Sequence, residues 1–264
     1  MKKCIGILLV FVVHASLYSY IKMPGEVRRI QSERYQQKER FSSIELDYEP
    51  ACTILEFWIP SISQTLMITS RLSEKDFSVQ ALSLKERIQK FTNFTECSTI
   101  EDLEPLMPLF KEIKCYYQDI ICNPFVDKSL SMLARHFLIE LEYCVDLLTG
   151  IEYSRLARVQ FLNRLNIGNV WLIKNLLVRS HQRCLIKQAY HLMCHAKRWH
   201  CESELLAHTI EILCEFYEYY DLLKERMNNN TLNVVIPTGV FADLIDHFVG
   251  IAQYSQDVLK GLKK

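Results

Sequence analysis

Metal-binding side chains recur at helical spacing on two adjacent segments of this 264-residue chain. Five of the eight histidines lie between residues 181 and 208. Residues three or four positions apart share one face of a helix, so each set forms a stripe. The first stripe contains His181, Cys184, Gln188, His191 and His195, and the second contains Glu204, His208, Glu211 and Glu215.

Folding the two segments back on each other near residue 201 would place the stripes face to face. His195 would then lie opposite His208, and His191 opposite Glu211. Imidazole nitrogens and carboxylate oxygens hold zinc tetrahedrally, and an open coordination position supports hydrolysis by an activated water. The sequence therefore raises a zinc hydrolase as an alternative function. A solvent-exposed polar stripe explains the same pattern without a ligand, so we expect no cofactor. The four candidate metal ligands are His191, His195, His208 and Glu211.

Other catalytic patterns are absent from the sequence. His136 and Glu140 are four residues apart, but a di-iron bundle needs Glu-x-x-His motifs from two helices, and none occurs. The chain has only 7 glycines, whereas phosphate-binding loops and nucleophile elbows depend on glycine. GxGxxG, GxxxxGK[ST], GxSxG, HExxH and CxxC are all missing. The sequence therefore favours a non-enzymatic protein.

Charge is segregated although the total is zero. Residues 151–200 carry nine Lys and Arg against Glu152 alone, a net charge of +8, and residues 201–226 carry a net charge of −5. We expect these segments to be antiparallel neighbours that pair their charges within the chain. The alternative is a basic face that binds anionic lipid or an acidic partner. Its candidate residues are Arg179, Arg183 and Lys187.

Helical periodicity dominates the chain from residue 51 onward, and the predicted fold is an all-α multi-helix bundle of about seven to nine helices. We expect one helix over residues 152–165, a turn at 166–169 around Gly168, and a long or kinked helix over 170–199. Residues 232–236 form a single β-like run without an obvious partner strand.

The first 21 residues resemble a targeting segment rather than part of the bundle. Two lysines precede an apolar stretch, and residues 4–21 carry no charge. A cleaved signal peptide and an N-terminal membrane anchor both fit this pattern, and a buried first helix is the third alternative. We therefore predict a signal or anchor at 1–21, a charged helical stem at 22–50 and a helical domain at 51–264. The expected location is the secretory pathway or cell envelope, either secreted or attached through a single span.

The leading hypothesis from the sequence is an exported or membrane-anchored helical protein that acts by binding another macromolecule. A protein is the expected partner. Contact with a membrane is expected only through residues 4–21 or the basic 151–200 segment. Nucleic acid is disfavoured, because the net charge is zero and no recognisable binding module occurs.

Overall fold

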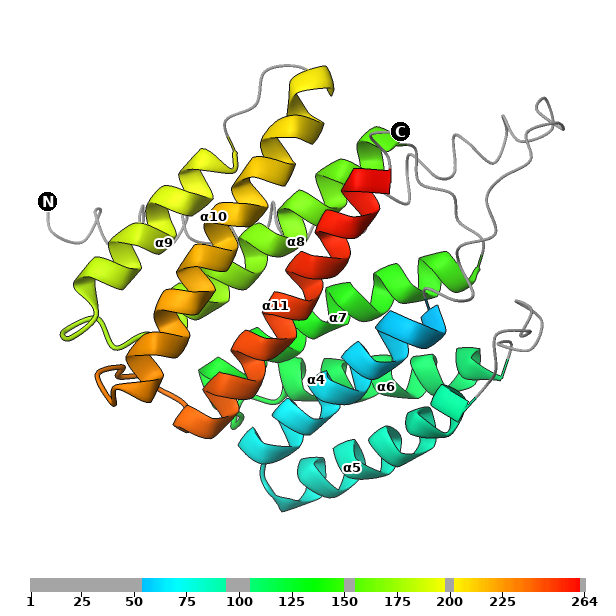
Figure 1. Ribbon diagram of the computed structural model, residues 1–264. Helices are drawn as coiled ribbons and strands as arrows, with labels where there is room; N and C mark the ends of the chain where they lie inside the picture. Colours follow the sequence, from blue (N-terminus) through cyan, green and yellow to red (C-terminus); the bar gives the residue numbers. More distant parts are fainter. Residues whose placement is uncertain (1–53, 94–104, 150–154, 198–201, 262–264) are drawn as a thin grey trace, which may run out of the picture. The chain divides into compact units, whose positions relative to one another are not determined.

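Eight α-helices account for nearly all of the residues that the structure, a computed structural model, describes: 54–93, 105–149, 155–197 and 202–261. They form an all-α bundle, as the sequence predicts (Figure 1). The described residues all belong to one compact unit, Glu49–Lys264. The helices are α4 (Ile59–Leu72, after a π-helical turn at Ile54–Trp58), α5 (Lys75–Gln89, before a 3-10 turn at Lys90–Asn93), α6 (Leu106–Cys122), α7 (Lys128–Leu148), α8 (Arg155–Leu176), α9 (Arg183–His195), α10 (Glu202–Asn228) and α11 (Thr238–Gly261).

Helices α5, α6 and α7 in the first half of the bundle are amphipathic, as their sequence pattern predicts. α5 buries Ala81, Leu84 and Ile88 and exposes the charged residues between them. Asp127 caps the N-terminus of α7. Its carboxylate accepts a hydrogen bond from the backbone nitrogen of Ser129. α4 packs against α5, α7 and α11, and α6 packs against α5 and α7. α4 and α7 thereby connect this half to the remaining helices.

α8 is continuous, which corrects the prediction of a turn at 166–169. It packs against α7, α9, α10 and α11, and residues 165–170 are all buried. Three buried asparagines bond to three different elements. Asn163 donates to the backbone oxygen of Ala196 at 3.0 Å, Asn166 donates to Ser255 at 2.8 Å, and Asn169 contacts His136 at 2.6 Å. These residues remain helical because neighbouring helices supply the polar partners that a turn would otherwise provide.

The predicted long helix over 170–199 is also corrected, because α8 ends at Leu176 and α9 starts at Arg183. Between them, Leu177 forms an isolated antiparallel bridge with Val234. Val178 donates to the backbone oxygen of Asn233 at 3.0 Å, and Val235 donates to that of Leu176 at 2.9 Å. The β-like run at 232–236 therefore pairs with the end of α8.

The predicted signal or anchor at 1–21 and the charged stem at 22–50 lie outside the described residues. Among the helices that are described, none combines the length and apolar character needed to cross a bilayer.

Candidate functional site

His195 of α9 and His208 of α10 meet where these two helices pack side by side and run in opposite directions (Figure 1). Nδ1 of His195 lies 3.1 Å from Oε1 of Glu215. Nε2 of His208 donates to the backbone oxygen of His195 at 3.0 Å, and the ring centroids are 5.1 Å apart. The predicted approach of His195 to His208 is thus confirmed.

His191 and Glu211, the other two predicted metal ligands, lie on exposed faces of α9 and α10. The sequence placed Glu211 opposite His191. The carboxylate that contacts His195 is that of Glu215, which lies seven residues after His208 on the same face of α10. Across the described residues, which include all four predicted ligands, no three His, Cys, Asp or Glu side chains could together hold a metal ion. The zinc site that the sequence raised as an alternative is therefore not assembled among the described residues.

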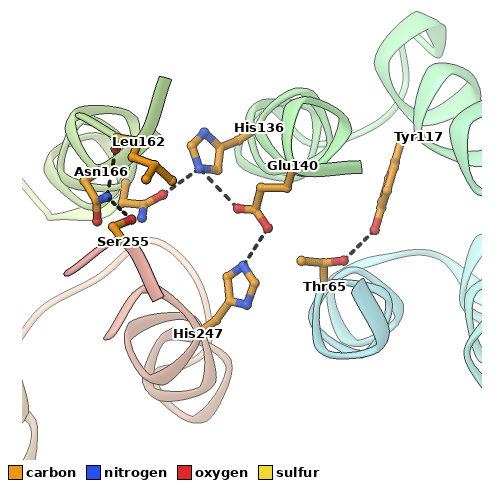
Figure 2. A network of polar contacts seen from close by, with 9 residues as sticks. Thr65, Tyr117, His136, Glu140, Leu162, Asn166, His247 and Ser255 are labelled. Carbon is orange, nitrogen blue, oxygen red and sulfur yellow. Dashed lines mark hydrogen bonds and ion pairs between the residues drawn. The ribbon is translucent and has the colours of Figure 1, made fainter. Parts of the chain in front are cut away.

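A different polar cluster lies inside the bundle (Figure 2). Its centre is Glu140 of α7, which lies between two imidazoles. Oε2 of Glu140 is 2.9 Å from Nε2 of His247 on α11, and Oε1 is 3.4 Å from Nε2 of His136, one turn earlier on α7. The side chains of Glu140 and His247 are each 1% exposed, and that of His136 is 4% exposed. Three ionisable side chains from two helices therefore share one buried site.

The hydrogen positions in this cluster follow from the partners of each ring. A carboxylate only accepts hydrogen bonds, so Nε2 of His247 carries the hydrogen that bonds to Glu140. Nε2 of His136 lies closer to Oδ1 of Asn169, at 2.6 Å, than to Glu140, and it donates to that amide oxygen. Oε1 of Glu140 consequently accepts no hydrogen bond from the described residues. Burial lowers the pKa of His136, although the charge of Glu140 and the bond to Asn169 act in the opposite direction.

Aromatic rings form the walls of this cluster. The ring of Phe248 lies 5.8 Å from that of His136, and the ring of Phe137 lies 5.7 Å from that of His247. Nearby, the hydroxyls of Thr65 and Tyr117 share a hydrogen bond of 2.7 Å (Figure 2). Burial raises the pKa of Tyr117 well above its ordinary value, and the charge of Glu140 adds to the effect. A general acid or base must reach a substrate, whereas these groups are enclosed by the core.

Sequence reasoning identified the His136–Glu140 pair but missed His247. The signal that could have revealed His247 is its place in the buried stripe of α11, next to Phe248 and three residues after Leu244. A histidine at such a position needs a polar partner. That partner is 107 residues away in the sequence, and helical periodicity carries no information about so distant a contact.

The predicted basic residues do lie on the surface. We define the α9 basic face as Arg179, Arg183, Lys187, Tyr190 and Lys197, all of which are exposed. Tyr190 is 58% exposed. Burial, together with the nearby charges of Arg179 and Lys197, lowers the pKa of Lys174 on α8.

The sequence predicts that the basic residues of 151–200 pair with the acidic residues of 201–226. Between the described side chains of α9 and α10, the one such contact is His195–Glu215. Arg183 and Lys187 are exposed, and their spacing from His195 rotates them by about 80–120° around α9 from the side that contacts α10. Comparison of the chain with protein-family models gives no match, and comparison with curated protein sequences gives none either. Function is therefore inferred from burial, contacts and charge.

Proposed function

We propose that this chain is a non-enzymatic helical protein that binds an anionic macromolecular partner through the α9 basic face. The observation that carries the proposal is the exposure of Arg183, Lys187 and Tyr190 together on one side of one helix. Arginine and tyrosine are enriched at the energetic centres of protein interfaces, and clustered cations speed the association of an acidic partner. The favoured partner is an acidic protein surface.

The buried cluster supports a role other than catalysis. Its ionisable groups have the chemistry that acid–base catalysis uses, but their contacts are with one another and with the core. The half-exposed His195–Glu215 pair also has an internal partner, His208. Secretion or anchorage through residues 1–21 remains part of this proposal, because the N-terminal sequence resembles a targeting segment.

The test is binding of the full chain to a fluorescent poly-glutamate peptide, measured by anisotropy. The R183A/K187A variant should bind at least about tenfold more weakly, since cation loss weakens charge-driven association. The control K75A/K111A removes two exposed cations from α5 and α6 and should bind like the unmodified chain. Equal binding by all three proteins would refute the proposal.

Vesicles of phosphatidylcholine, with and without phosphatidylserine, test the membrane alternative with the same three proteins. Binding to the anionic vesicles alone, lost in R183A/K187A and absent for poly-glutamate, would favour a membrane surface over an acidic protein.

A further inference from the structure

An acidic stripe runs along the exposed face of α10, beside the α9 basic face. Its members recur at helical spacing and are all exposed: Glu211, Glu218, Asp221 and Glu225. The neighbouring side of α10, toward α9, contains His208 and Glu215, which contact His195. The opposite side faces α11, where Lys224 pairs with Asp246 at 2.8 Å. The acidic stripe therefore lies between these two contacts and points outward.

The contact of His195 with α10 fixes which residues of these two antiparallel helices lie at the same height along the helix axes. Lys187 lies eight residues before His195, which contacts residues 208 and 215 of α10. Because antiparallel helices advance by the same rise per residue, Lys187 lies at the level of about residues 216–223 of α10. Arg183, one turn earlier, lies at the level of about residues 220–227. Opposite charges thus occur at equal heights on adjacent helices, but both point away from the seam.

We propose that the anionic partner of the α9 basic face is the acidic stripe of a second copy of this chain. This inference rests on the proposed function and names the partner of the same face. In this dimer, a two-fold axis runs parallel to the helices and passes over the outer side of the seam between α9 and α10. The symmetry places α9 of each copy over α10 of the other copy at the same height. Each complementary contact then occurs twice, as a two-fold interface requires.

Charge complementarity favours a second copy of the chain as the partner of the α9 basic face. Within one copy, neither Arg183 nor Lys187 forms an ion pair with the acidic stripe among the described residues, although both lie at its level. In the paired copies, the same cations face Glu218, Asp221 and Glu225 directly. Tyr190 lies near the middle of the basic face and supplies apolar area among the charges. The net charge of zero over the chain removes the long-range repulsion that would oppose self-association.

A charge-swap experiment tests the dimer on the full chain. The first variant is R183E/K187E, which makes both faces acidic, and the second is E218K/D221K, which makes both faces basic. Analytical ultracentrifugation should show a dimer for the unmodified chain, weakened by 0.5 M salt because exposed charges are screened. Each variant alone should dissociate about 100-fold more readily, since several ion pairs are lost and replaced by repulsion.

Mixing the two variants should restore a heterodimer, because each swapped face then meets an opposite charge on the other copy. Circular dichroism of each variant verifies its folding, and E86K/D119K, which reverses two exposed charges on α5 and α6, is the control for charge reversal elsewhere. A zero-length carbodiimide should join Lys187 to Glu218 or Asp221 between isotopically labelled and unlabelled copies of the unmodified chain. Failure of the mixture to associate, with both variants folded, would overturn the dimer.

The outcomes also separate this inference from the proposed function. A monomeric chain that binds poly-glutamate through Arg183 and Lys187 would overturn the dimer and leave the proposed function standing. A monomer whose poly-glutamate binding is insensitive to R183A/K187A would overturn both.

Discussion

Removing His247 is expected to destabilise the bundle more than removing the carboxylate that it contacts. His247→Leu puts an apolar side chain of similar size in place of the imidazole. It leaves Glu140, which is 1% exposed, without its closest hydrogen-bond donor. That loss should cost about 3 kcal/mol or more, because a buried acceptor that carries charge is costlier to leave without a donor than a neutral group. Glu140→Met leaves only the Nε2–H group of His247 unsatisfied, which costs about 1–3 kcal/mol.

The double variant separates this interpretation from a simple loss of packing. E140M/H247L removes both partners and replaces them with apolar side chains, while His136 keeps its 2.6 Å bond to Asn169. An apolar replacement of a buried pair is often neutral or stabilising. The double variant should therefore lose less free energy of unfolding than the sum of the two single variants, by about 1–3 kcal/mol.

The assay is urea unfolding of the full chain at pH 7, followed by circular dichroism at 222 nm and by tryptophan fluorescence. Coincident transitions from the two probes justify a two-state free energy of unfolding. The matched control is Val79→Ala on α5, an apolar side chain that is 60% exposed and should change the free energy by less than about 0.5 kcal/mol. Additive losses of less than about 1 kcal/mol for both single variants would show that no buried hydrogen bond joins Glu140 of α7 to His247 of α11.

Two further predictions concern the same core. Burial lowers the pKa of His136 in the folded protein, so the unfolded chain binds the proton more readily; stability should fall as the pH drops below about 6.5. The loss in urea midpoint from pH 7.5 to 5.5 should be smaller in H136Q, and an equal loss in both proteins would contradict the assignment. Tyr117→Phe removes the 2.7 Å bond to Thr65 and should cost about 1 kcal/mol in urea unfolding, because the buried Thr65 hydroxyl loses this partner and keeps only its bond to the backbone oxygen of Ile62. The double variant T65V/Y117F should recover part of that loss, and no recovery would argue against the bond.

The fold class and most helices were predictable because their burial is one-sided. α5 has one buried stripe and one charged face, and that asymmetry is written in the sequence at a period of 3.6 residues. α8 lacks such asymmetry because neighbours surround it, and residues 165–170 are buried on every side. Its asparagines, which usually favour turns, therefore suggested a break that the structure does not have.

The candidate sites depended on relations between distant helices, which the sequence specifies only indirectly. The approach of His195 to His208 was predictable because a short connection forces the two helices to be neighbours. Glu211 and Glu215 share the predicted stripe, and helical spacing alone does not resolve which of the two contacts His195. His247 belongs to another helix, and its pairing with Glu140 required the tertiary structure.

The three asparagines of α8 have a consequence for how the chain finds its native arrangement. Each amide is paired with a different neighbouring element, one near the end of α9, one on α11 and one on α7. Apolar helices can slide by one turn and still bury similar surface, so hydrophobic burial alone separates such registers poorly. A one-turn slide of α8 would separate all three amides from these neighbours. Asn163 and Asn169 would lose the bonds described above, at about 1–3 kcal/mol each, whereas Asn166 would keep its bond to the backbone oxygen of Leu162 within α8. Misregistered compact states are thereby raised by several kcal/mol, and α8 acts as the reference against which the other helices align during folding.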